Sequence, residues 1–143
     1  MAIAYCFDTD VLSTIIKRNP PMALVRRFAL VHPSQQFTTS ITLGEMLFGA
    51  AKKGDPRLTL RVRKIIREAS VVLPFDEPAA EVYGPLRSEL ETAGRPLAEP
   101  DLRIASIALA HDLILVTGNV KHFERIPNLS IENWIQALDS EME

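Results

Sequence analysis

Short apolar runs alternate along this chain with longer stretches in which apolar residues recur every three or four positions. The short runs predict buried strands, and the longer spacing predicts amphipathic helices. The predicted strands are residues 3–7, 36–39, 71–75 and 113–117, with 128–131 as a fifth strand at an edge. The predicted helices are residues 11–17, 22–30, 40–51, 57–69 and 102–111, and a long helix between Asp76 and Gly94 that Pro85 should kink or divide. This alternation indicates an α/β fold with a parallel sheet.

Polar residues stand close to the ends of three predicted strands. Asp8 directly follows the first strand, Glu45 lies one turn into the helix after the second, and Asn119 follows the fourth strand. Asp101 begins the helix that precedes that fourth strand. Because the carboxyl ends of parallel strands share one edge of a sheet, we expect these side chains to converge there.

The donor atoms at this edge are carboxylate and amide oxygens. Converging carboxylates repel, which raises their pKa values, and a bound divalent cation reverses that effect. Mg²⁺ prefers such hard oxygen ligands. The sequence offers no cluster of cysteines and histidines of the zinc type. His32, His111 and His122 show no ligand spacing, and we expect all three to be surface or loop residues.

Each candidate residue also has a purely structural interpretation. Two acids within three residues, Asp8 and Asp10, do not both need to cap one helix, which leaves one of them for another task. The remaining alternatives are a helix cap from Asp8, Thr9 or Asp10, a capping box between Thr42 and Glu45, a favourable first-turn charge at Asp101, and a turn at residues 118–119.

Composition narrows the class of protein. A length of 143 residues with 47% hydrophobic and 24% charged residues fits one globular domain over residues 1–143. The single cysteine, Cys6, allows no internal disulfide and fits the reducing cytoplasm as the compartment. We expect no signal peptide, because the start lacks a basic region followed by a long apolar run. We expect no membrane span, because no apolar stretch reaches about 18 residues. The net charge of −2 argues against a protein that coats nucleic acid.

Several segments together resemble the PIN-domain ribonucleases, and most closely the VapC toxins of bacterial and archaeal toxin–antitoxin pairs. The resemblance covers nearly the whole chain in the right order. The matching segments are FDTDVLS at residues 7–13, SITLGEMLFGA at 40–50, GRPL at 94–97, DLRIA at 101–105, LVTGN at 115–119, FERIP at 123–127 and ENW at 132–134. Any one segment is weakly specific, whereas the ordered set is specific.

The resemblance implies a PIN-like fold, in which an open, mostly parallel sheet is flanked by helices on both faces. It places the family's acidic site on Asp8, Glu45 and Asp101, which would bind Mg²⁺, with Mn²⁺ as a substitute. It places a fourth polar position on Asn119 and a supporting hydroxyl on Thr117. Asp10 departs from the family, which usually has asparagine there, and Asn119 replaces the aspartate of many PIN domains.

The resemblance also implies a function. The chain would be the toxin of a type II toxin–antitoxin system, a metal-dependent endoribonuclease that cleaves RNA phosphodiester bonds. Its partners would be RNA, a second copy in a homodimer and a cognate VapB-like antitoxin in a hetero-oligomer. We expect the antitoxin to use a groove flanked by helices 11–17 and 40–51, with Ile15, Leu47 and Phe48 near its rim. The candidates for contacts to the RNA backbone are Lys52, Lys53, Arg57, Arg61 and Arg95. The alternative is that several of these side chains only lie in solvent on the outer face of a helix.

Two other functions stay open on the sequence alone. Residues 7–12 also look like the nucleophile motif of haloacid-dehalogenase-type phosphatases, in which Asp8 would form an aspartyl-phosphate. A non-catalytic PIN fold that only binds RNA is the other alternative. Trapping a phosphate mimic on Asp8 would favour the phosphatase, and metal-dependent RNA cleavage would exclude the binding module.

Overall fold

The apolar runs pair into one parallel sheet in the computed structural model, which describes residues 3–69 and 71–135. The strand order is β3-β2-β1-β4-β5, and every neighbouring pair is parallel. The strands are β1 (Tyr5–Phe7), β2 (Gln36–Thr39), β3 (Val71–Leu73), β4 (Ile114–Val116) and β5 (Ile131–Glu132). The α/β prediction is therefore confirmed. The predicted single domain also includes residues 136–143, which lie outside the described residues.

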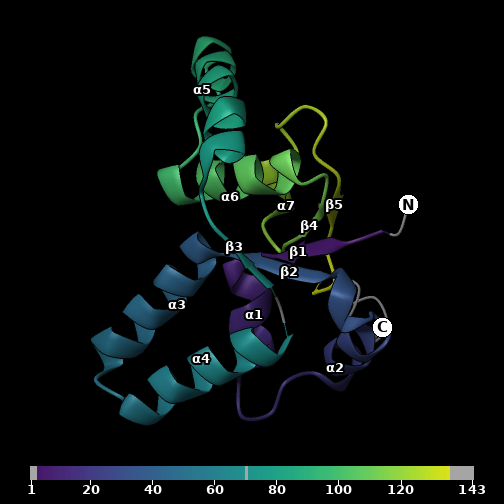
Figure 1. Cartoon of the computed structure of the whole chain (residues 1–143), viewed down its shortest axis with the longest axis vertical. Helices are drawn as coiled ribbons and strands as arrows, with labels where there is room; N and C mark the ends of the chain where they lie inside the picture. The colour runs from purple at the N-terminus through teal and green to yellow at the C-terminus, as the bar shows by residue number, and fades with distance from the viewer. Residues whose placement is uncertain (1–2, 70, 136–143) are drawn as a thin grey trace.

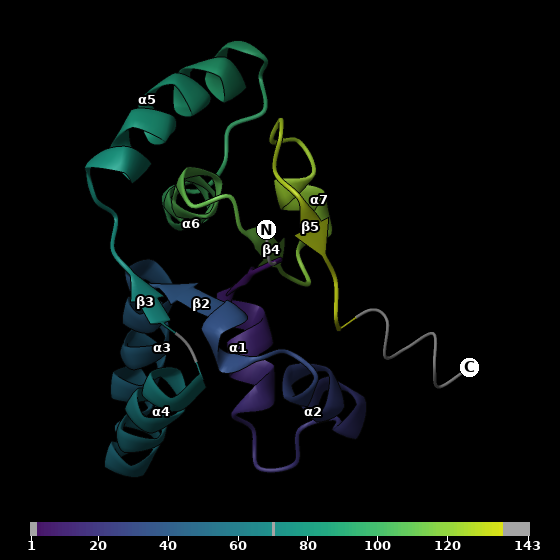
Figure 2. The ribbon, with the colours of Figure 1, turned by 45° about the vertical axis from the view of Figure 1, so that its right-hand side comes forward.

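Helices cover both faces of this sheet, as the resemblance implied. α5, α6 and α7 lie on one face, and α1 to α4 lie on the other (Figures 1 and 2). The helices are α1 (Thr9–Ile15), α2 (Met22–Ala29), α3 (Ser40–Lys53), α4 (Pro56–Ala69), α5 (Glu77–Thr92), α6 (Glu99–Ala110) and α7 (Val120–Phe123), with a 3-10 turn at Pro33–Gln35. None of the helices in the described part of the chain is both long and apolar enough to cross a membrane.

Two apolar clusters hold the helices on the sheet. Cys6 and Leu115 face the cluster under α5 and α6, whereas Phe7 and Val116 face the cluster over α1 to α4. This division follows from the strand geometry, because successive side chains point to opposite faces. Cys6 is the buried core residue that the sequence predicted, and burial raises the pKa of its thiol.

Three details differ from the predicted elements. The fifth strand begins at Ile131 instead of residue 128, because Asn128 has a φ of 66° and takes a left-handed turn. α5 continues through Pro85 without a division. Proline removes the N–H that would bond to the Glu81 carbonyl, but both residues are exposed, so water can bond to that carbonyl. α7 was not predicted, because four residues are too few to show a helical period.

Candidate functional site

The strand order reverses direction at the centre of the sheet. β1 pairs with β2 on one side and with β4 on the other, so the carboxyl ends of β1 and β4 lie next to each other. Ligands of open α/β sheets bind at such a topological switch point. The structure places Asp8 at the end of β1 and Thr117 at the end of β4. The structure therefore brings Asp8 and Thr117 together at this edge of the sheet.

Asp8 is held between the two strand ends and is only 3% exposed. Its Oδ1 accepts the backbone N–H of Thr9 at 2.7 Å, which caps α1, and its Oδ2 accepts the hydroxyl of Thr117 at 2.7 Å. Burial raises the pKa of Asp8 to about 6, and the charges of Asp10 and Asp101 raise it too. The two hydrogen bonds act in the opposite direction. Asp8 is thus both a helix cap and a charge held at the site.

Asp10 joins the site through the loop after β4. Its Oδ2 accepts the backbone N–H of Gly118 at 2.8 Å. Its Oδ1 is buried and has no hydrogen-bond partner among the described residues. Burial, with the neighbouring charge of Asp101, raises the pKa of this carboxyl. A Cβ on Gly118 would lie 2.5 Å from Oδ2 of Asp10, so the contact requires glycine at position 118.

Glu45 reaches the site from α3, where its side chain is exposed. Its Oε1 accepts the hydroxyl of Thr9 at 2.8 Å, a contact between residues on different helices. The capping-box interpretation of Glu45 is wrong. Thr39 caps α3 and accepts the N–H of Thr42 at 3.0 Å, which places Glu45 beyond the capping position. Sequence reasoning missed the role of Thr9, because nothing local links it to Glu45.

Asp101 lies in the first turn of α6, where its side chain is partly buried. Burial raises its pKa, and the ring of His122 on α7 lowers it. The Nδ1 of His122 lies 3.6 Å from Oδ2 of Asp101. His122 is exposed, as predicted, but its contact with a site residue was not expected. Its distance in sequence from Asp101 gave no signal of that contact.

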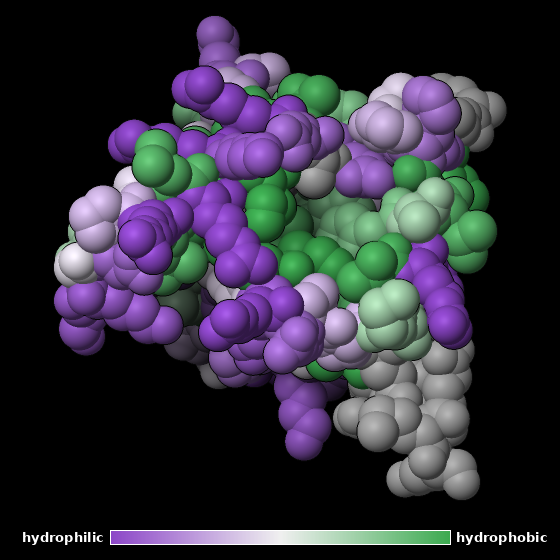
Figure 3. Space-filling model, turned by 90° about the horizontal axis from the view of Figure 1, so that it is seen from below, coloured by the Kyte–Doolittle hydropathy of each residue, from purple (hydrophilic) through white to green (hydrophobic). Residues whose placement is uncertain are grey.

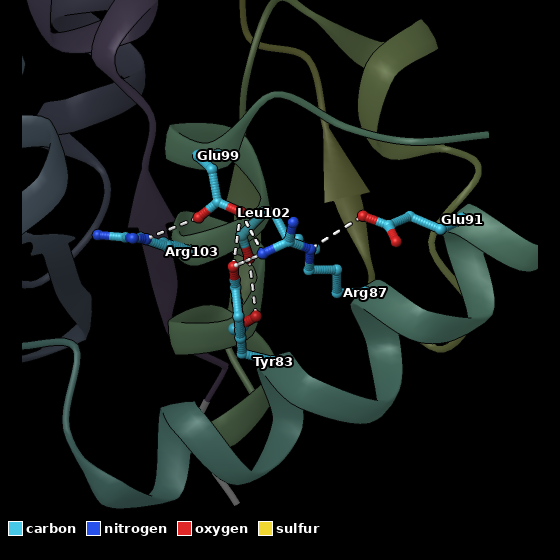
Figure 4. Close-up of polar contacts among 7 residues, drawn as sticks. Tyr83, Arg87, Glu91, Glu99, Leu102 and Arg103 are labelled. Carbon is cyan, nitrogen blue, oxygen red and sulfur yellow. Dashed lines mark hydrogen bonds and ion pairs between the residues drawn. The ribbon is translucent and has the colours of Figure 1, made fainter.

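A polar cluster holds the start of α6 against α5 (Figure 4). The Glu99 carboxylate accepts the hydroxyl of Tyr83 and forms ion pairs with Arg87 at 3.2 Å and Arg103 at 3.0 Å. The hydrogen bond from Tyr83 is the main cause that lowers the pKa of Glu99. Because Glu99 is two residues from Asp101, this cluster fixes the turn that carries the catalytic candidate.

Asn119 and Thr117 complete the edge of the site. The backbone N–H of Asn119 donates to the Thr117 hydroxyl at 3.0 Å. The exposed Asn119 side chain forms no hydrogen bond with any residue in the described ranges, and it does not cap α7. Thr117 therefore holds both the Asp8 carboxylate and the Asn119 backbone, while the Asn119 amide is available to a ligand or a water molecule.

The residues fit a divalent cation by their chemistry. Asp8, Asp10 and Asp101 repel one another, and buried Oδ1 of Asp10 lacks a partner in the described part of the chain. A cation would offset the repulsion among these carboxylates. Within residues 3–69 and 71–135, no three His, Cys, Asp or Glu side chains already form a chelating group. The support for a metal is thus the charge and type of the donors, and not a preformed geometry.

A groove of about 400 Å³ lies beside the site, between α1, α3 and α4. Thr9 and Glu45 line one end of it. Its apolar lining is Ile16, Met46, Ala50, Leu58 and Val62, and its cationic rim is Lys17, Arg18, Lys53 and Arg61. Seen from the side of these helices, the molecule has an apolar hollow bordered by hydrophilic side chains (Figure 3).

The residues predicted for this groove need correction. Ile15 lines a separate hollow next to α2. Leu47 is partly buried against the apolar cluster on the side of α1 to α4. Phe48 is 67% exposed but does not line the groove. Ile16 takes the place that the sequence assigned to Ile15, since neighbouring helical residues point about 100° apart.

Comparison with known proteins agrees with this architecture. Residues 5–129 match the family model of the PIN domain. The chain is 36% identical over 132 residues to the tRNA(fMet)-specific endonuclease VapC of Salmonella typhimurium, covering 92% of this chain and 98% of that protein. It is 31% identical over 133 residues to Ribonuclease VapC2 of Haemophilus influenzae, covering 93% and 99%.

The fold is similar to that of a solved toxin–antitoxin complex. VapBC2 from Rickettsia felis, bound to a DNA fragment from its promoter, contains a chain that matches with a TM-score of 0.84 and 32% identity. The match covers 92% of this chain and 99% of that one. Sequence and fold therefore agree over almost the entire length of both proteins.

Proposed function

The chain belongs to the PIN-domain family, and we propose that it is the toxin of a type II toxin–antitoxin system, an endoribonuclease that cleaves RNA phosphodiester bonds. The proposal rests on the charge of Asp101 acting on Asp8, and on the bond between Glu45 and Thr9, the residue after Asp8. It rests equally on the match of more than nine-tenths of the chain to VapC ribonucleases. All three acids are present, which argues against the non-catalytic alternative. The phosphatase alternative has no support from the family match.

The reaction we propose depends on Mg²⁺, with Mn²⁺ as a substitute. Asp8 and Asp101 would hold the ion, and Glu45 would bind it directly or through water. When bound, the ion would activate a water molecule and offset charge on the phosphate. Asn119 would orient that water with its side-chain amide. Thr117 holds Asp8, and Asp10 holds the backbone of Gly118, so these two residues position the groups that act.

The partner we propose is an antitoxin with an amphipathic segment. The groove between α1, α3 and α4 has an apolar floor and a cationic rim, which suits a helix with one apolar face and acidic flanks. Because Glu45 lies at one end of the groove, a bound segment would end close to the carboxylates. An arginine there would pair with Asp8 and Asp101 and compete with the metal. A homodimer inside that hetero-oligomer, and the cytoplasm as its compartment, stay predictions.

Expression of the chain by itself tests the biological role. Induction without the antitoxin should arrest bacterial growth and produce new RNA 5′ ends at defined sites. Asp8→Asn should relieve both effects, because the amide keeps the size of the side chain and removes a charge that binds metal. Arrest of equal strength by a soluble, folded Asp8→Asn protein would contradict the assigned site.

A further inference from the structure

A second pocket, of about 460 Å³, lies between the loop that follows α5 and the helix α7. Its lining residues are Gly94, Arg95, Lys121, Glu124 and Arg125. Three of them are cations, one is an anion, and none has a large apolar side chain. A pocket of this composition suits a small anionic group and offers nothing to an apolar helix face.

The backbone holds the two sides of this pocket together. Gly94 has a φ of 71°, which turns the chain sharply at the end of α5. The Nη1 of Arg125 donates to the backbone carbonyl of Pro96 at 3.3 Å and so ties α7 to that loop. The pocket is therefore built from two segments that are distant in sequence and linked by a direct hydrogen bond.

The charges in this pocket are not neutralised by ion pairs. Among the lysines and arginines in the described ranges, Arg27, Arg87 and Arg103 form ion pairs with glutamates, and all the others, Arg95, Lys121 and Arg125 included, form none. Arg95 and Lys121 are both exposed. Their charges are available to a ligand from solution, in a chain whose overall charge is negative.

Both segments continue directly into the catalytic candidate site. Lys121 is next to His122, whose ring contacts Asp101 at 3.6 Å. α7 begins immediately after Asn119, and the loop with Arg95 leads into α6, which carries Asp101 in its first turn. The basic pocket therefore shares α7 and the loop before α6 with the candidate site.

We propose that Arg95, Lys121 and Arg125 form a second phosphate-binding site, which holds the RNA backbone beyond the bond that is cut. This inference rests on the proposed ribonuclease function. The arginines supply planar donors that match phosphate oxygens, and the lysine adds a mobile point charge. The other cations named from the sequence lie elsewhere: Lys53 and Arg61 line the groove by α1, where a protein partner would cover them.

RNA binding measured against salt concentration tests this site. The full chain carrying Asp101→Asn, which should bind without cutting, is titrated with a labelled single-stranded RNA, with and without the double change Arg95→Gln/Lys121→Gln. The double variant should bind more weakly. The slope of log affinity against log salt should fall in magnitude by about 0.7 for each phosphate that the protein no longer neutralises. Arg63→Gln/Lys64→Gln, which removes one arginine and one lysine from exposed positions on α4, is the matched control and should leave the slope unchanged.

Cleavage kinetics give a second readout on the chain with Asp101 intact. The double variant should raise KM for a long RNA and leave KM unchanged for a dinucleotide, because a dinucleotide has only the phosphate that is cut. If the chain cuts RNA in an Asp101-dependent manner but the double change alters neither the salt slope nor KM, the second site is wrong. The proposed ribonuclease function is then unaffected. If the chain neither binds nor cuts RNA, both are wrong. Loss of antitoxin binding with unchanged RNA binding would assign the pocket to the protein partner and overturn the inference.

Discussion

The hydroxyl of Thr117 donates to Oδ2 of Asp8 at 2.7 Å and joins the ends of two adjacent strands across 109 positions of sequence. The Thr117 hydroxyl oxygen also accepts the backbone N–H of Asn119 at 3.0 Å. One buried side chain therefore fixes both the carboxylate at the end of β1 and the start of the loop after β4. The proposed site depends on Thr117 for its shape and for the charge of Asp8.

Thr117→Val removes that hydrogen bond while it keeps the volume. The hydrogen bond lowers the pKa of Asp8, so its loss should raise the pKa above about 6. Protons would then compete better with the metal, and the Mg²⁺ concentration for half-maximal cleavage should rise more at pH 6 than at pH 8. A buried carboxylate without its donor should also cost about 1–3 kcal/mol of unfolding free energy. Thr117→Ser keeps the hydroxyl, so its Mg²⁺ requirement and its unfolding free energy should match those of the wild type. If Thr117→Val also matches the wild type in both quantities, the role of Thr117 is contradicted.

Asp8→Asn should stabilise the metal-free fold at neutral pH. Folding raises the pKa of Asp8 from its ordinary value of 3.8 to about 6, so the folded chain binds the proton more tightly. The unfolding free energy therefore falls as pH rises from about 4 to about 6, by on the order of 3 kcal/mol. Asparagine does not titrate. The unfolding free energy of the variant, measured in urea, should exceed that of the wild type at pH 7.5. This difference should disappear by pH 4. An equal difference at both pH values would contradict this account.

Gly118→Ala should disturb the loop that carries Asn119. The new Cβ would lie 2.5 Å from Oδ2 of Asp10, so that carboxylate must move and give up its bond to the Gly118 N–H. We expect a loss of about 1–3 kcal/mol in unfolding free energy. Gly44→Ala is the control, because Gly44 is exposed within α3 and its added Cβ would meet no atom within 4 Å apart from its chain neighbours and its own helix backbone. Helix propensity predicts a gain of up to about 1 kcal/mol there. An unchanged unfolding free energy in Gly118→Ala would show that the contact between Gly118 and Asp10 is easily replaced.

The partner groove is tested by a pair of equivalent charge insertions. Leu58 lines the groove, whereas Phe48 is exposed on α3 outside it. Leu58→Asp should weaken binding of the antitoxin at least tenfold, since an aspartate would be desolvated against an apolar face. Phe48→Asp should have a smaller effect. Circular dichroism checks that both variants fold, and a larger effect from Phe48→Asp would move the docking surface to the outer face of α3.

The fold was predictable from local patterns, and the position of Asp8 at the edge of the sheet followed from one general rule. Apolar runs that stop at Asp8 and Thr117 indicate strand ends, and parallel strands bring such ends together. The contacts from Thr9 to Glu45 and from His122 to Asp101 were not predictable, because they require the packing of separate helices. The predicted rim residues of the groove, Ile15, Leu47 and Phe48, were wrong for the same reason. The helix itself was predicted, but the direction of its faces depends on which neighbours it packs against.

Cleavage of a labelled RNA by the metal-free chain tests the central proposal most directly. The protein is freed of metal with a chelator and dialysed, and the rate is then measured as Mg²⁺ or Mn²⁺ is added, with Asp101→Asn as the variant at equal concentration and equal helical content. Metal-dependent catalysis at these acids predicts no cleavage without metal, a rate that rises to saturation with either ion, and a loss of at least a hundredfold in the variant. Full cleavage in excess chelator, or equal rates from the folded variant, would contradict it.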